Sequence, residues 1–276
     1  MKQCAWGMAV GLVYLLSGLA FAGDPVVATV TNVPPSGMVL IPAGINSGTD
    51  PDIGLYSLTN PTAFYMDATE VTKAKWDEVY AWGATHGYRG LRTGGGKATN
   101  HPVQSVNWYD VVKWCNVRSE KEGKTPCYNL NDWSCNFAAN GYRLPTNTEW
   151  EYAARGGLSG KRFPWGDIID HTRANYYGTA SGFNFDQGYA GYDKRYITEA
   201  SPHTSPVGSF EANGYGLYDM VGNVWEWCND VTPSGQSRSL RGGAWANLAP
   251  LTLWRRHIWD RATDNCYLNG FRAVCR

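Results

Sequence analysis

The sequence has no excess of charge of either sign and few charged residues. Its 276 residues include 24 basic and 24 acidic side chains, so the formal net charge is zero. A neutral chain lacks the basic field that binds nucleic acid, and it has no acidic tail. Charged residues make up only 17% of the chain and hydrophobic residues 43%. This balance argues against intrinsic disorder and against a coiled coil.

Several motifs of common catalytic sites are also missing. The chain contains no G-x-S-x-G, no H-E-x-x-H and no C-x-x-C sequence. Residues 94–97 resemble a phosphate-binding loop, but Leu91 stands where the first glycine is required and Ala98 where Ser or Thr would bind Mg²⁺. These absences argue against an elbow-type serine hydrolase, a zinc metalloprotease and a phosphate-loop NTPase.

The sequence is rich in large aromatic residues and glycine, with 13 Trp, 17 Tyr and 32 Gly. This combination predicts a loop-rich fold held together by buried rings. Capping residues and apolar spacing predict three helices, beginning at Thr72, Asn107 and Thr146. Short strands are predicted at residues 37–44, 64–67, 225–227, 239–241 and 271–274. Residues 158–216 show almost no periodicity, and so long a loop is usually functional. We expect one α+β domain.

The N-terminus has the features of a secretory signal peptide. Lys2 precedes an apolar run from about residue 5 to 20, and Ala20-Phe21-Ala22 forms an A-x-A cleavage site. We therefore predict a signal peptide over residues 1–22, a flexible lead-in over 23–36 and a domain over 37–276. The mature protein would be secreted or periplasmic, and would not span a membrane.

Export would place the cysteines in a compartment where disulfides can form. Six remain after the signal peptide, at positions 115, 127, 135, 228, 266 and 275. An even number in an oxidising compartment suggests disulfides, and six cysteines allow 15 pairings. A Cys127–Cys135 bridge is the first prediction, and Cys266 and Cys275 have similar spacing. For Cys115 and Cys228, free core thiols and a bridge between them are equally open.

Residues 219–226 have the character of a metal-binding loop. Two carboxylates, Asp219 and Glu226, lie seven residues apart with Gly222 between them. Calcium takes six to eight oxygen ligands, often carboxylates combined with backbone carbonyls of one irregular loop. The two carboxylates with the carbonyls of Gly222 and Val224 would supply such a set. The alternative is an Asp in a turn and a Glu paired with an Arg.

Many segments together resemble the formylglycine-generating enzyme family, also called sulfatase-modifying factors. They occur in family order at residues 37–44, 66–72, 101–103, 141–146, 149–151, 153–157, 163–166, 213–219, 222–227, 241–245 and 270–272. The resemblance implies a single domain with a variant C-type-lectin-like fold, low in regular secondary structure and stabilised by calcium.

The resemblance also implies metal ligands. One family calcium site falls on Asp219, Gly222, Val224 and Glu226, the positions that the spacing had indicated. A second would begin at Asn175 and the carbonyl of Tyr176. Its remaining ligands should lie near residues 193–196, where the sequence departs from the family pattern.

The family's catalytic positions are changed in this chain. Activity in the family depends on two cysteines that bind copper and use O₂, and their places are held by Asn247 and Thr252. An amide and a hydroxyl cannot replace the soft thiolate ligands of copper(I). Ala244 replaces the family's usual Ser. We therefore expect no formylglycine generation. The pocket candidates by resemblance are Trp225, Arg241, Trp245, Asn247 and Thr252.

Two functions stay open on the sequence. The chain could be a divergent oxidase or maturation factor that uses copper or iron with O₂. It could instead be a non-catalytic, lectin-like module that binds a peptide, a glycan or a partner protein. Metal analysis would separate them, because bound copper or iron favours the enzyme. We expect a monomer in either case.

Overall fold

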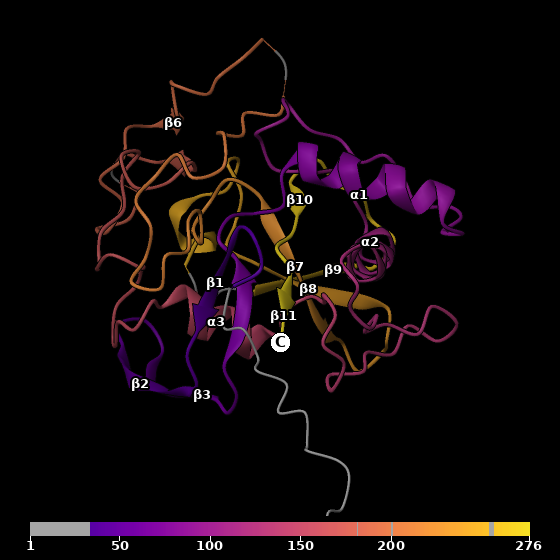
Figure 1. Ribbon diagram of the computed structural model, residues 1–276. Coiled ribbons are helices and arrows are strands. Elements are labelled where there is room, and N and C mark those ends of the chain that lie inside the picture. The colour runs from indigo at the N-terminus through magenta and orange to yellow at the C-terminus, as the bar shows by residue number, and fades with distance from the viewer. Residues whose placement is uncertain (1–33, 181, 200, 254–256) are drawn as a thin grey trace, which may run out of the picture. The chain divides into compact units, whose positions relative to one another are not determined.

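The computed structural model describes residues 34–180, 182–199, 201–253 and 257–276, which form one compact unit (Figure 1). Short strands, three helices and long loops alternate in this unit, as the α+β prediction required. The predicted signal peptide and residues 23–33 of the lead-in lie outside the described residues. Among the described helices, none has the length and apolar character needed to cross a bilayer.

The three helices begin where the capping residues predicted. They are α1 (Lys73–Thr85), α2 (Trp108–Lys121) and α3 (Asn147–Ala154). The side chains of Thr72, Asn107 and Thr146 each accept a backbone N–H of the first turn, and Glu149 completes a capping box at α3. Such caps contribute about 1 kcal/mol each, because a helix leaves its first N–H groups without partners.

Two sheets organise the domain. The first joins β1 (Met38–Ile41), β4 (Phe64–Asp67) and β11 (Val274–Cys275). The second has the order β10 (Asn269–Gly270), β7 (Trp225–Val231), β8 (Ser237–Arg241) and β9 (His257–Arg261). In both, strands from the C-terminal end of the chain pair with strands from earlier segments (Figure 1).

Regular structure is sparse between α3 and β7. The described residues of this segment form only β5 (Tyr177–Gly178) and β6 (Gly191–Tyr192), which pair with each other. A short 3₁₀ turn, η1 (Ala249–Leu251), follows β8. The long aperiodic loop expected from the sequence is therefore confirmed, and it occupies the upper left of Figure 1.

A hairpin of β2 (Gly44–Asp50) and β3 (Gly54–Asn60) has no counterpart in the predicted strands. Its polarity is inverted. Asn46, Asp50 and Asn60 face inward, and Asn46 Nδ2 donates to the carbonyl of Leu158 at 3.0 Å. The outward residues include Leu55, which is 88% exposed. Strand prediction from sequence looks for apolar residues at every second position. It misses this hairpin because the inward residues are polar and are held by hydrogen bonds.

Buried aromatic residues tie the irregular backbone to the regular elements. The rings of Trp76 on α1 and Trp114 on α2 stack with centroids 5.7 Å apart, and Phe271 packs edge-on against both. The indole N–H of Trp108 donates to the carbonyl of Cys228 at 3.0 Å, and that of Trp227 to Val106 at 3.0 Å. The aromatic excess thus serves as core and as cross-links.

The predicted Cys127–Cys135 disulfide is not formed, and all six described cysteines are free. Tyr128 pairs across a hairpin with Cys135, and the amide of Asn136 donates to the carbonyl of Cys127 at 2.7 Å. Because side chains alternate along extended backbone, Cys127 and Cys135 point to opposite faces of this hairpin. Cys266 and Cys275 are likewise unbridged.

Candidate functional site

The loop that was predicted to bind calcium has left-handed backbone at three positions. Asp219, Gly222 and Asn223 have φ angles of 56°, 81° and 61°. A Cβ at Gly222 would lie 2.2 Å from the carbonyl oxygen of Asn175, so only glycine fits there. The loop is therefore irregular, as the calcium prediction required.

Asp219 is buried at the start of this loop. Its Oδ2 accepts the backbone N–H of Gly208 at 2.5 Å, while Oδ1 has no hydrogen-bond partner among the described residues. Burial raises the pKa of the Asp219 carboxyl to about 6. A buried carboxylate oxygen without a partner is costly, and a bound cation would remove that cost.

Glu226 at the end of the loop is paired with an arginine. Arg272 donates from Nη2 to Oε1 and from Nε to Oε2, both at 2.7 Å, and the indole of Trp150 donates to Oε2 at 2.6 Å. The Glu–Arg alternative seen in the sequence is therefore present. A carboxylate has about four lone-pair positions, so one remains on Oε1 for a metal.

Glu70 belongs to the same cluster, although the sequence reasoning did not select it. Its Oε1 accepts from Asn223 Nδ2 at 3.1 Å, and its Oε2 is buried without a partner in the described structure. Burial and the nearby Asp219 carboxylate raise the pKa of Glu70 well above its usual value. No spacing signal links two residues 149 positions apart, so only the fold reveals this pair.

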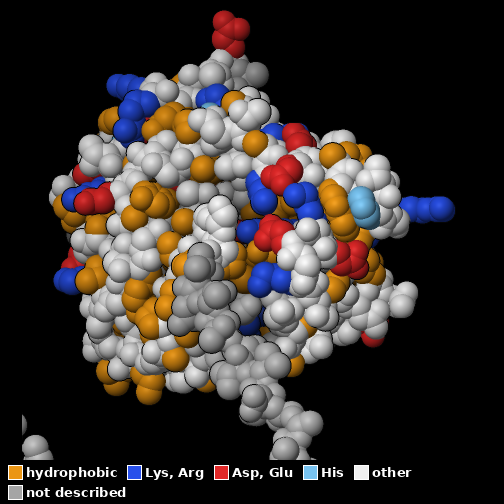
Figure 2. Space-filling model, viewed as in Figure 1, with side chains coloured by type: hydrophobic (Ala, Val, Ile, Leu, Met, Phe, Trp, Pro, Cys, Tyr) orange, Lys and Arg blue, Asp and Glu red, His pale blue; other side chains and the backbone are white. Residues whose placement is uncertain are grey.

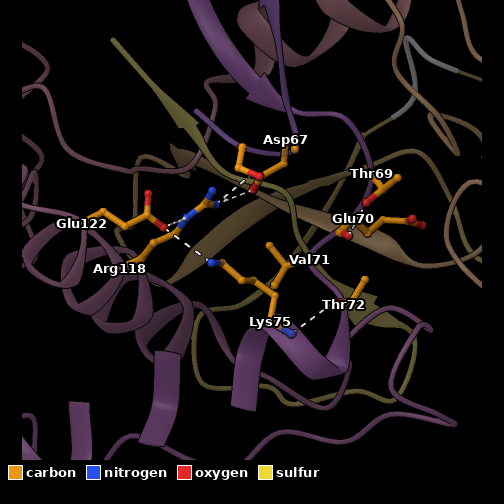
Figure 3. A pocket seen from close by; sticks show the side chains of 10 residues that line it. Asp67, Thr69, Glu70, Val71, Thr72, Lys75, Arg118 and Glu122 are labelled. Carbon is orange, nitrogen blue, oxygen red and sulfur yellow. Dashed lines mark hydrogen bonds and ion pairs between the residues drawn. The ribbon is translucent and has the colours of Figure 1, made fainter. Parts of the chain in front are cut away.

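Glu70 also marks the edge of a cavity of about 300 Å³ between β4, α1 and α2 (Figure 3). There Arg118 Nη1 donates to both oxygens of Asp67 at 2.9 Å, and Arg118 Nε donates to Glu122 at 3.2 Å. Figure 3 shows the Glu70 side chain directed away from Arg118. Ion pairs thus line this cavity, and the Glu70 carboxyl is directed to the cluster around Asp219 instead.

The residues of this cluster fit a hard cation. Asp219 Oδ1 and Glu70 Oε2 are two buried, unpartnered carboxyl oxygens, and the carbonyls of Gly222 and Val224 belong to the same loop as Asp219. Calcium binds oxygen ligands of these kinds. Within the described residues no group of three His, Cys, Asp or Glu side chains is arranged to hold a metal. A site here would therefore depend on backbone carbonyls as well as carboxylates.

The metal-free protein should lose stability as the pH rises from about 4 to above 6. The folded-state pKa of Asp219 is raised from 3.8 to about 6, so the folded state binds a proton more tightly than the unfolded chain. Protonation of Asp219 therefore stabilises the fold fully below the pKa of Asp219 in the unfolded chain. This stabilisation is lost as the pH rises above its pKa in the folded state. The difference amounts to about 3 kcal/mol. Melting temperatures in a chelator at pH 4.5 and 7 measure it.

The control for this pH effect is Asp219→Asn, which keeps an oxygen for the Gly208 N–H but cannot titrate. Its melting temperature in chelator should change less between the two pH values than that of the wild type. Equal pH profiles for the two proteins would contradict the assignment of the effect to Asp219.

The second predicted calcium segment lies beside the first. Asn175 forms a parallel bridge with Gly222, and its Nδ2 donates to the carbonyl of His203 at 2.9 Å. Near the expected remaining ligands, Asp193 is buried and ion-paired with Arg195 at 2.6 Å. The Arg195 guanidinium thus pairs with the carboxylate that lies nearest to the expected second site. The assignment of Asn175 and Tyr176 as calcium ligands stays a prediction.

Asn247 and Thr252, which the resemblance matches to the family's catalytic cysteines, lie in one loop after β8. Asn247 Oδ1 accepts the backbone N–H of Ala244 at 2.9 Å and so closes a turn. The hydroxyl of Thr252 is fully buried and donates to the carbonyl of Ala249 at 2.8 Å. Both side chains therefore hold the loop in shape.

The other three pocket candidates are all buried. Trp225 is a buried part of the main hydrophobic cluster. Arg241 donates to Asn147 Oδ1 at 2.8 Å and pairs with Glu151 at 3.3 Å, so it ties β8 to α3. Of the five candidates, Asn247 is partly exposed and the other four are buried.

Trp245 is the centre of a group that we call the aromatic cluster, made of Tyr177, Tyr192, His203, Trp245 and Tyr267. Ring centroids lie 4.8 Å apart for Trp245 and His203, 5.4 Å for Trp245 and Tyr192, and 6.0 Å for Trp245 and Tyr267. Tyr267 is 50% exposed, and Trp245 Nε1 is buried without a partner in the described part of the chain. The cluster offers ring faces and one unused N–H donor.

Comparison with protein families identifies the chain. A family model described as "Sulfatase-modifying factor enzyme 1-like domain" matches residues 24–276. The bovine (Bos taurus) formylglycine-generating enzyme is 31% identical over 257 residues, which covers 77% of this chain and 66% of that enzyme. The chain belongs to the family of sulfatase-modifying factors, or formylglycine-generating enzymes.

Other relatives bear different names. "Chaperone protein LppX" of Paenibacillus barcinonensis is 35% identical over 216 residues, covering 70% of this chain and 73% of that protein. "Inactive C-alpha-formylglycine-generating enzyme 2" of Mus musculus is 41% identical over 195 residues, covering 62% and 58%. The family thus includes members named as inactive or as chaperones.

Solved structures show the same fold. CarF superposes with a TM-score of 0.69 at 26% identity, over 87% of this chain and 98% of CarF. Treponema denticola variable protein 1 gives a TM-score of 0.65 at 25% identity, over 87% and 94%. The described chain has the variant C-type-lectin-like fold of this family, as the sequence motifs predicted.

Proposed function

We propose that this protein is an exported, calcium-stabilised member of the family that binds a peptide segment on its aromatic cluster and does not generate formylglycine. The absence of formylglycine generation is argued from the side chains at the two positions that the resemblance matches to the catalytic cysteines. The side chains of Asn247 and Thr252 are engaged in hydrogen bonds to their own loop, and neither is a soft ligand or a nucleophilic thiol.

A peptide fits the aromatic cluster better than a purely apolar ligand does. The exposed ring of Tyr267 and the half-buried rings of Tyr192 and His203 can pack against an apolar side chain. The indole N–H of Trp245 is buried beneath these rings, so it would reach a peptide carbonyl only if the rings of the cluster move apart on binding. Recognition would thus rest on ring contacts, with one directed hydrogen bond that forms only in the bound state.

Selection from a displayed peptide library tests the proposal. We expect peptides that bind the wild-type protein and lose at least tenfold in affinity with Tyr267→Ala. Trp259→Ala is the matched control, because Trp259 is an exposed aromatic (42%) outside the cluster. The proposal fails if no peptide is selected, or if Tyr267→Ala binds as tightly as the control.

Elemental analysis tests the competing function. A divergent oxidase or maturation factor would carry copper or iron in stoichiometric amount and consume O₂ with a substrate. Bound calcium alone supports the binding module, and either redox metal at one equivalent with O₂ uptake overturns it.

Export is inferred from the N-terminal pattern, since the A-x-A site at residues 20–22 predicts a mature chain that begins at Gly23. N-terminal sequencing of the exported protein decides this, and an intact Met1 in the exported fraction would contradict it.

A further inference from the structure

A second cleft lies at the other end of β8 from the aromatic cluster. Its volume is about 560 Å³, and it lies between the loop that follows α2 and the ends of β7 and β8. It is lined by two aromatic rings, two carboxylates and a guanidinium, those of Trp133, Phe137, Asp132, Asp230 and Arg238. None of the functions considered so far uses these residues.

The backbone around the cleft is specialised in two places. Trp133 has a φ angle of 63°, a left-handed conformation that costs an aromatic residue free energy. The pairing of β7 with β8 shifts register between Trp227 and Val231, which is the stretch that contains Asp230. Bulges of this kind redirect side chains and are frequent beside binding sites.

The floor of the cleft has a donor and an acceptor that no described residue uses. Arg238 stacks on Trp108 at 3.7 Å and donates from Nη1 to the carbonyl of Asn229 at 2.9 Å, while its buried Nε has no partner in the described structure. Its Nη2 makes no hydrogen bond to the described residues either. Asp230 accepts the N–H of Asn147 through Oδ2 only, which leaves Oδ1 available.

The charges around the cleft select the class of ligand. The carboxylates of Asp132 and Asp230 would repel an anionic ligand. A cation is opposed by Arg238 and by Arg143, whose guanidinium lies 4.9 Å from the Phe137 ring centre. Sugar hydroxyls both donate and accept, so they suit the Arg238 donor and the Asp230 acceptor, which line the same cleft. The ring of Phe137, on a residue that is 38% exposed, can pack against the apolar face of a sugar ring.

We infer that this cleft binds a neutral saccharide, with Phe137 and Trp133 packing against the sugar ring and Arg238 and Asp230 hydrogen-bonding its hydroxyls. The inference does not depend on the proposed peptide binding, because the two sites share no residue.

Saturation-transfer NMR tests the inference with four neutral probes: maltotriose, cellotriose, mannotriose and triacetylchitotriose. We expect at least one to bind, and to lose tenfold or more in affinity with Phe137→Ala and with Arg238→Gln. Because Phe137 is partly exposed, its variant should fold, and an unchanged melting temperature confirms this. Tyr267→Ala should leave saccharide binding unchanged while it lowers peptide affinity at least tenfold.

Two results overturn the inference. One is the absence of transfer to all four probes. The other is binding that survives Phe137→Ala and Arg238→Gln at wild-type affinity, which would place the sugar elsewhere. Neither result bears on the peptide selection, so the two proposals can fail separately.

Discussion

Supplied with copper and a sulfatase-type peptide, the purified protein is expected to leave the peptide cysteine unconverted. Copper(I) requires soft thiolate ligands, and the loop after β8 offers an amide at Asn247 and a buried hydroxyl at Thr252. Cys115 and Cys228 are not expected to substitute, because both are fully buried and burial raises the pKa of each thiol above its usual value. Mass spectrometry of the peptide, which detects loss of sulfur, should match a control without enzyme.

A double variant tests whether the missing thiols explain the expected lack of activity. Asn247→Cys with Thr252→Cys restores two thiols to the one loop, and it should gain copper(I) binding that the wild type and Asn247→Ser with Thr252→Ser lack. The prediction is contradicted if the wild-type protein converts the peptide cysteine and loses this activity when one of its own cysteines is substituted. In that case other residues of the protein would carry out the reaction.

Removal of calcium should lower the melting temperature by roughly 5–10 °C. A ligand at a hundredfold excess over its dissociation constant stabilises the folded state by about 2.7 kcal/mol. In a domain of this size each kcal/mol corresponds to roughly 2–4 °C. Melting curves with calcium and with a chelator measure the difference. Asp219→Ala and Glu70→Gln should each abolish most of it, because each removes one of the two buried, unpartnered oxygens.

Two further variants separate a ligand from a structural partner. Glu226→Gln should lower the melting temperature with and without calcium, because it leaves Arg272 buried without its carboxylate; removing one partner of such a pair costs about 3–5 kcal/mol. Asp77→Ala, at an exposed position on α1, should leave the calcium effect intact. If chelation leaves every melting curve unchanged, the cation site is wrong.

The helices show what local sequence can determine. Thr72, Asn107 and Thr146 each satisfy a backbone N–H within three residues, so the start of each helix is encoded in adjacent positions. The family was also readable from sequence, because its motifs are short and occur in order. The β2–β3 hairpin was not readable, since polar Asn46 and Asp50 are buried through contacts with distant residues.

The sequence alone therefore determined the family, the α+β class and the helix starts, and its resemblance to the family predicts that Asn247 and Thr252 stand at the catalytic cysteine positions. Only the tertiary structure placed Glu70 beside Asp219, paired Glu226 with Arg272 and directed Cys127 and Cys135 to opposite faces of their hairpin. The physical reason is the range of the interactions. Caps and turns are closed within a few residues, whereas burial, ion pairing and the direction of a side chain depend on segments that only the folded chain brings together.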